Sequence, residues 1–238
     1  MTPTILMVHG AFANGDVWHA YKKAFEAKGY ICLTPTLRFH DPDPTQSPDP
    51  QLATTSLLDY VADLTAEISM LDEPPVIIGH SLGGIITQIL AGHGLARMAV
   101  LLTPAPPADV FALHPATIKT FHTALAQWAF WQKVYRLPFH SAVYGVFNCE
   151  PAKTHESLYQ HLSWESGRAL AESALPFLDP NKVTHVKSEN VTCPMLVVGA
   201  NHDRSIPTSV VRRIARKYKT ATYLEFPNHG HWLHAEPN

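Results

Sequence analysis

The chain has 238 residues, of which 46% are hydrophobic and 16% charged, and its formal net charge is −2. This length and apolar content predict one globular domain with a large core and exclude a disordered chain. The balanced charge, without a basic stripe, argues against a nucleic-acid-binding protein. No apolar run is long enough to cross a bilayer, so we expect no contact with the membrane interior.

The cysteines and the first residues of the sequence indicate the cellular compartment. Cys32, Cys149 and Cys193 are few and far apart, which argues against a disulfide framework and favours a reducing compartment. The first residues enter a strand-like run without the charged and apolar regions of a signal peptide. We therefore expect a cytoplasmic protein.

Strand-like and helix-like segments alternate along the chain. Six short, mostly apolar runs are predicted to be strands, at residues 4–8, 30–33, 76–78, 98–103, 195–198 and 222–226. Apolar residues recur at three- and four-residue steps within residues 57–71 and 208–218, as on one face of an amphipathic helix. This alternation predicts an α/β fold with a mainly parallel six-stranded sheet flanked by helices.

Two regions interrupt the alternation. Residues 35–50 contain five prolines, which predicts an ordered, rigid connection. Residues 104–190 contain no convincing strand, only helical patterns at 116–135 and 165–178. Twelve of the chain's 23 aromatic residues lie within 105–185, so we expect a helical cap over a site, inserted into a core formed by 1–103 and 191–238. A larger helical core is the alternative.

A strand–turn–helix unit surrounds Ser81. The apolar run at 76–78 leads into Gly79-His80-Ser81-Leu82-Gly83, and an apolar helical pattern follows. Glycines two residues before and after a serine allow the tight turn that exposes its hydroxyl at the carboxyl end of a strand, beside a helix N-terminus. Ser81 is therefore a candidate nucleophile, with an idle serine in a glycine-rich turn as the alternative.

A nucleophilic serine needs a base and an acid that orients the base. Asp203 follows the strand predicted at 195–198, and His231 follows the strand predicted at 222–226. Both should lie at the carboxyl edge of the sheet, where Ser81 also lies. His229 is an alternative base, and Asp109, after the strand at 98–103, is an alternative acid.

Four motifs together resemble the α/β-hydrolase superfamily, in the branch with a His-Gly-x oxyanion loop. They are His9-Gly10-Ala11, Gly79-His80-Ser81-Leu82-Gly83-Gly84, Gly199-x-x-x-Asp203 and Gly230-His231-Trp232. The resemblance implies a Ser81–His231–Asp203 triad, favouring His231 over His229 and Asp203 over Asp109. It also implies an oxyanion hole formed by the backbone N–H groups of Ala11 and Leu82.

Five aromatic or histidine side chains are expected to contact substrate: Phe12, His80, Trp128, Trp131 and Trp232. His9 and His80 are also expected to brace the loops they belong to. Residues 165–168 are a possible polar contact for substrate, with a solvated helix start as the alternative.

The resemblance implies a serine hydrolase that cleaves carboxylic esters of hydrophobic acids or alcohols through an acyl-enzyme on Ser81. Lactonase, thioesterase, amidase or perhydrolase activity would use the same triad, and a receptor-like member of the fold would bind a ligand without turnover. Hydroxynitrile lyase activity is a weaker alternative, because plant hydroxynitrile lyases have threonine and lysine where this chain has Gly10 and Trp232.

No cofactor is expected. His229 and His231 lack a third ligand at zinc spacing, so no metal is expected either. The expected partner is a small ester, and the oligomeric state stays open, with a homodimer among the candidates. Seven residues follow His231, so any terminal helix should be short, and the first strand leads straight to the His9-Gly10 loop without a preceding hairpin.

Overall fold

A six-stranded parallel sheet forms the centre of the computed structural model, which describes residues 3–40, 43 and 45–236. The strands lie in the order β2-β1-β3-β4-β7-β8. Their bounds are β1 (Thr4–Val8), β2 (Ile31–Leu33), β3 (Val76–His80), β4 (Met98–Leu102), β7 (Met195–Ala200) and β8 (Ala221–Phe226). The α/β fold class and the six parallel strands expected from the sequence are confirmed.

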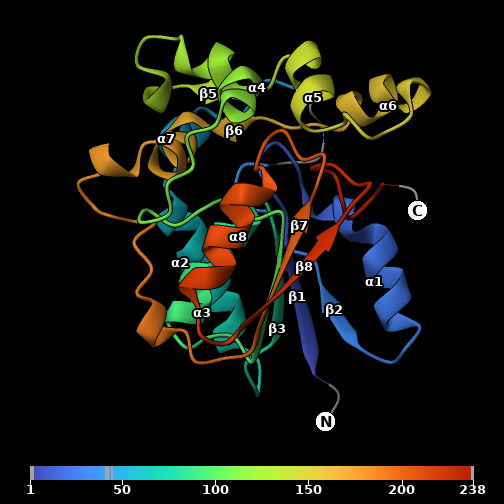
Figure 1. Ribbon diagram of the computed structural model, residues 1–238, viewed down its shortest axis with the longest axis vertical. Coiled ribbons are helices and arrows are strands. Elements are labelled where there is room, and N and C mark those ends of the chain that lie inside the picture. The colour runs from blue at the N-terminus through green and yellow to red at the C-terminus, as the bar shows by residue number, and fades with distance from the viewer. Residues whose placement is uncertain (1–2, 41–42, 44, 237–238) are drawn as a thin grey trace.

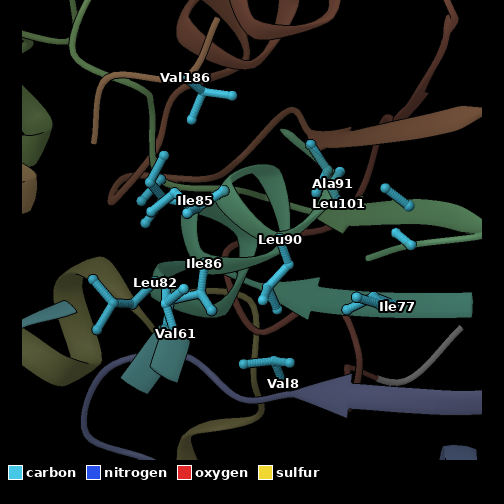
Figure 2. Packing of buried hydrophobic residues seen from close by; sticks show 14 of the residues in the cluster. Val8, Val61, Ile77, Leu82, Ile85, Ile86, Leu90, Ala91, Leu101 and Val186 are labelled. Carbon is cyan, nitrogen blue, oxygen red and sulfur yellow. The ribbon is translucent and has the colours of Figure 1, made fainter. Parts of the chain in front are cut away.

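Helices cover both faces of the sheet because the strand residues alternate between two apolar clusters. Leu6 and Val8 of β1 pack with α2 (Leu57–Ser69), α3 (Leu82–Gly92) and α8 (Thr208–Lys217). Ile5 and Met7 face the other way, toward the side chains of α1 (His19–Glu26) and the preceding Trp18. Figure 2 shows side chains of α3 packed against Ile77 and Val8. Burial of both faces explains why the strands are continuously apolar.

Local signals in the sequence set the start of α2. The Ser56 hydroxyl accepts a hydrogen bond from the Leu58 N–H, and the Asp59 carboxylate accepts one from the Ser56 N–H. This reciprocal capping satisfies two backbone donors that the first turn of a helix would otherwise leave free.

Residues 104–190, which we call the insertion, lie between β4 and β7 in the chain, and most of them lie across the end of the sheet where the strands finish (Figure 1). The last of them run back down beside the core, where Val183 and Val186 pack in the same cluster as α3. The insertion contains α4 (Pro115–Leu125), α5 (Phe139–Gly145), α6 (His155–Gln160), α7 (Gly167–Ala174) and two short strands, β5 (Val134–Tyr135) and β6 (Glu165–Ser166). The expectation that it holds no strand was wrong. The antiparallel pairing of β5 with β6 joins residues about thirty positions apart, which no local pattern signals.

The helix predictions within the insertion were too long. The helix expected at 116–135 ends at Leu125, and Ala129 then adopts a left-handed φ of 54°. The helix expected at 165–178 begins only at Gly167, because Glu165 and Ser166 pair with β5.

Apolar and polar contacts join the insertion to the core. Phe12 and Trp232, on loops of the core, share one cluster with Tyr135, Leu137 and Phe147 of the insertion. A second anchor is polar: the buried Glu172 of α7 accepts hydrogen bonds from the Ser56 hydroxyl and the Leu57 N–H, both at 2.8 Å.

The last described residues lie close to the core. Residues 232–236 form a turn in which the Trp232 carbonyl accepts hydrogen bonds from the N–H groups of Ala235 and Glu236. In the proline-rich connection, residues 41, 42 and 44 lie outside the described part, while Leu37 and His40 are buried. None of the helices that the described residues form has the length and apolar content needed to span a membrane.

Candidate active site

Ser81 occupies a strained turn between β3 and α3. Its φ and ψ are 50° and −116°, a conformation that costs free energy for a residue with a side chain and that recurs at functional sites. The flanking glycines make the turn possible. A Cβ at Gly79 would lie 2.3 Å from the Gly83 carbonyl oxygen, and a Cβ at Gly83 would lie 2.2 Å from the Val8 carbonyl oxygen. Only glycine fits at these two positions.

Ser81, His231 and Asp203 form a continuous hydrogen-bonded chain. The Ser81 Oγ lies 3.0 Å from Nε2 of His231, and Nδ1 of His231 lies 2.8 Å from Oδ2 of Asp203. Because a carboxylate only accepts, His231 carries its proton on Nδ1 and leaves the Nε2 lone pair facing the serine hydroxyl. Asp203 and His231 are both buried, at 5% and 4% exposure.

The loop after β7 holds Asp203 rigidly. Its Oδ1 accepts hydrogen bonds from the backbone N–H groups of Ser205 and Ile206, both at 2.8 Å. The other carboxylate oxygen, Oδ2, is left to face His231. The arrangement positions the carboxylate through the backbone rather than through other side chains.

The alternative base and acid lie elsewhere. His229 packs against Phe226, with ring centroids 5.2 Å apart, and its carbonyl accepts a hydrogen bond from the His202 N–H. Asp109 forms an ion pair with Lys217 of α8 and is about half exposed. The geometry brings His231 and Asp203, rather than these two residues, to Ser81.

The loop after β1 lies against the nucleophile turn. A Cβ at Gly10 would lie 3.0 Å from the Ser81 Cβ, so Gly10 permits the close approach of the two loops. The next residue, Ala11, lines the same cavity as Ser81, and Leu82 is the first residue of α3. The backbone of both residues therefore lies beside the serine, at a helix N-terminus that favours negative charge.

His9 supports this loop as a neutral side chain. Its Nε2 accepts a hydrogen bond from the Leu37 N–H, so its proton lies on Nδ1, which donates to the Gly10 carbonyl. Complete burial, followed by the charge of nearby His40, lowers the pKa of His9 to about 3, although the hydrogen bond to the Gly10 carbonyl acts in the opposite direction.

A small cavity of about 20 Å³ opens onto Ser81. Three of the expected substrate-contacting side chains border it, namely Phe12, His80 and Trp232. The sequence did not single out three further lining residues, which come from the insertion: Phe121, Val146 and Leu162. Their apolar side chains belong to no motif, so only the tertiary packing identifies them.

Trp128 and Trp131 do not border this cavity, which corrects the expectation that they contact substrate there. Trp128 is 86% exposed, and the two indole rings pack against each other with centroids 6.2 Å apart. Trp131 instead lines a separate, larger cavity of about 540 Å³ beside α7. Trp128 follows the end of α4, and Trp131 lies in a short 3-10 helix, Phe130–Gln132.

Glu165 is a buried structural link rather than a polar contact in the cavity. Its Oε1 accepts a hydrogen bond from the Tyr60 hydroxyl at 2.8 Å, and its Oε2 lies 3.0 Å from Nε2 of His40. Both ring nitrogens of His40 face acceptors, since Nδ1 lies 3.1 Å from the Arg38 carbonyl. Burial opposes a charge on His40, but Glu165 and these hydrogen bonds raise its pKa.

Among the residues that the structure describes, no three His, Cys, Asp or Glu side chains are grouped to hold a metal ion. The groups that the site brings together are a serine hydroxyl, an imidazole, a carboxylate and backbone N–H groups.

Comparison with known proteins identifies relatives of this chain. The model of the alpha/beta hydrolase family matches residues 5–238. A pyrethroid hydrolase of Sphingobium wenxiniae is 30% identical over 121 residues, which span 48% of this chain and 42% of that protein, less than half its length.

Three solved structures share the fold over nearly the whole chain. A pyrethroid hydrolase from Sphingobium faniae has a TM-score of 0.72 at 19% identity and covers 99% of this chain and 92% of its own. A methylesterase from Arabidopsis has a TM-score of 0.74 at 12% identity, with 99% and 93% covered. An extracellular hydrolase from a Paenibacillus species has a TM-score of 0.74 at 17% identity, with 97% and 91% covered. The match of the family model over almost the entire sequence shows that the chain belongs to the alpha/beta hydrolase family.

Proposed function

We propose that this protein is a serine hydrolase that cleaves carboxylic esters through an acyl-enzyme on Ser81. One observation carries the proposal: the hydrogen-bonded chain from Asp203 through His231 to Ser81, with distances of 2.8 and 3.0 Å. Such a chain lets the imidazole remove the hydroxyl proton as the serine oxygen attacks a carbonyl carbon. Members of the family named for pyrethroids and methyl esters support ester cleavage.

The reaction proceeds in two halves. The Ser81 oxygen bonds to the ester carbonyl carbon, its proton passes to Nε2 of His231, and the backbone N–H groups of Ala11 and Leu82 stabilise the oxyanion. His231 then protonates the leaving alcohol as the carbon–oxygen bond breaks. Water attacks the acyl-enzyme by the same route, which releases the acid and restores Ser81. Asp203 stabilises the imidazolium in both halves, and each oxyanion donor contributes about 3–4 kcal/mol.

The lining of the cavity favours esters with a hydrophobic acid or alcohol. Besides the catalytic atoms, it presents mainly apolar side chains: Ala11, Phe12, Phe121, Val146, Leu162 and Trp232. At about 20 Å³ the cavity holds on the order of one water molecule, so a substrate enters only when side chains of the insertion move. We infer that the insertion is a cap that opens and closes over Ser81.

We also propose that the protein works in the cytoplasm as a cofactor-free enzyme on a small ester. Cys32, Cys149 and Cys193 are all free thiols, which fits a reducing compartment. Every proton that moves and every bond that forms or breaks in the two-step mechanism belongs to the ester, to water or to the three side chains.

The test compares the wild type with Ser81→Ala and a matched control, Ser69→Ala, in hydrolysis of p-nitrophenyl acetate, butyrate and octanoate. Ser69 is an exposed serine at the end of α2. We expect Ser81→Ala to lose turnover and labelling by a fluorophosphonate probe, while Ser69→Ala keeps both. Equal turnover by Ser81→Ala would overturn the mechanism.

A second set of substrates tests the ester class. Faster turnover of a lactone or a thioester by the same triad would reassign the substrate. Absence of turnover, combined with thermal stabilisation by an apolar ligand, would instead indicate a receptor-like protein.

A further inference from the structure

His80 lies where the three parts of the site meet. It is the last residue of β3 and directly precedes Ser81. Its Nε2 lies 2.8 Å from the backbone carbonyl oxygen of His231, and a Cβ at Gly10 would lie 2.9 Å from its Nδ1. One buried ring thus touches the nucleophile turn, the loop after β1 and the backbone of the base.

The hydrogen bond to His231 shows which ring nitrogen of His80 carries the proton. A carbonyl oxygen can only accept, so Nε2 of His80 carries the proton and donates it. The Nδ1 atom is buried without a hydrogen-bond partner among the described residues. Burial, followed by the neighbouring rings of His234 and His231, holds the pKa of His80 well below its usual range. The ring is therefore a neutral donor.

The surroundings keep this ring in one place. His80 packs against the rings of His231, Trp232 and His234, with centroids 4.9, 5.7 and 4.4 Å away. Its side chain is 1% exposed, although the residue borders the cavity. A ring enclosed in this way is poorly placed to follow a substrate, but it is well placed to hold a backbone group.

The backbone of His231 has a second, weaker support. The Thr103 hydroxyl also lies within reach of the His231 carbonyl, but at 3.3 Å. The bond from His80 is the shorter of the two, and it comes from the residue next to the nucleophile. This bond therefore joins the nucleophile turn directly to the backbone of the base, whose Nε2 lies 3.0 Å from the Ser81 Oγ.

We propose that His80 is a positioning residue, whose Nε2–H holds the main-chain carbonyl of His231 and so sets the distance between His231 Nε2 and Ser81 Oγ. The kinetic consequence rests on the proposed esterase function, whereas the structural consequence does not. Neutrality also matters, because a charged ring 4.9 Å from His231 would repel the imidazolium that forms during catalysis.

Four variants separate the donor from the volume of the ring. In His80→Gln the side-chain amide nitrogen lies about as far from the backbone as Nε2 of histidine, so it can donate to the same carbonyl. His80→Met fills similar space without a donor, and His80→Asn has a donor that is too short to reach. His93→Gln is the matched control, an exposed histidine at the opposite end of α3.

Two measurements are made on each full-length variant. The first is the low-field proton resonance of the His231 Nδ1–H that faces Asp203, in protein with ¹⁵N-labelled histidine, assigned by its absence in His231→Gln. The second is kcat and KM for p-nitrophenyl acetate. The resonance reports the position of His231 even if the protein cleaves no ester.

We expect His80→Met and His80→Asn to lower kcat by about 10- to 100-fold, since a displacement of about 1 Å at a reacting group costs on the order of 100-fold. KM should stay unchanged within about twofold, and the resonance should shift or broaden. His80→Gln should restore both readouts, and His93→Gln should match the wild type.

Two results would overturn the proposal. One is an unchanged His231 resonance in both His80→Met and His80→Asn. The other is a His80→Gln variant that behaves like His80→Asn, because the volume of the ring rather than its donor would then matter. If the wild type shows no turnover that depends on Ser81, the proposed function fails, and the resonance alone decides the role of His80.

Discussion

Replacing Asp203 by asparagine tests the orientation of the base with little change of shape. Asp203 Oδ1 accepts two backbone hydrogen bonds, from Ser205 and Ile206, and Oδ2 accepts one from His231. The single oxygen of asparagine is expected to keep the two backbone bonds, so its NH₂ group must face Nδ1 of His231. The imidazole must then carry its proton on Nε2, which faces Ser81 and can no longer accept the serine proton.

The size of the effect follows from these bonds. A base held in the wrong tautomer lowers kcat by about 10³- to 10⁴-fold, or about 4–5.5 kcal/mol of transition-state stabilisation. The folded state keeps its two backbone bonds and loses one charge-assisted hydrogen bond, which costs about 1.5–3 kcal/mol. Asp203→Asn should therefore fold and melt within several degrees of the wild type while losing nearly all activity.

The assay is kcat for p-nitrophenyl butyrate, with the free energy of unfolding measured in urea on the same samples. Asp109→Asn is the matched control, because Asp109 is the other acid that follows a core strand and it pairs with Lys217 instead. Activity of Asp203→Asn within tenfold of the wild type would refute the assignment. So would an equal loss in Asp109→Asn.

Three further predictions concern the insertion and the buried histidines. Glu165→Leu leaves the buried His40 ring and the Tyr60 hydroxyl without their common acceptor, so the free energy of unfolding in urea should fall by about 1–3 kcal/mol for each of the two groups. Leu162→Ala enlarges the cavity beside Ser81; it should raise kcat/KM for octanoate relative to acetate esters and cost about 2–5 kcal/mol of stability. Because burial lowers the pKa of both His9 and His234 to about 3, the unfolded chain binds more protons below pH 6.5. Stability should then decrease toward acid by up to about 1.4 kcal/mol per pH unit for each histidine.

Each of these predictions has a clear contrary result. Equal urea midpoints for the wild type and Glu165→Leu would mean that the pair with His40 does not anchor the insertion. An unchanged chain-length profile for Leu162→Ala would show that this side chain does not limit substrate size. For the acid dependence, His234→Phe should flatten the slope between pH 6.5 and 4.5, and an unaltered slope would contradict the linkage.

Local patterns in the sequence determine the sheet and the order of the catalytic residues. Apolar runs predict all six strands within a few residues, because strands buried on both faces must be continuously apolar. The glycines around Ser81 predict the tight turn, because the contacts at Gly79 and Gly83 leave no room for a Cβ. Parallel strands bring the loops that hold Asp203 and His231 to one edge, which made both residues candidates. The resemblance to the family then favoured them over Asp109 and His229.

Only the tertiary structure decides how the insertion meets this edge. The β5–β6 pair, the outward direction of Trp128 and Trp131, and the lining residues Phe121, Val146 and Leu162 depend on contacts between distant segments. The roles of the buried polar groups have the same origin. The sequence pointed to His80 and to residues 165–168 as candidate substrate contacts, but not to their hydrogen-bond partners. The His231 carbonyl lies 151 positions from His80, and the His40 ring lies 125 positions from Glu165. Periodicity and short motifs carry no information about such pairings, because they describe neighbours along the chain, whereas a buried donor or charge is defined by the partner that folding brings to it.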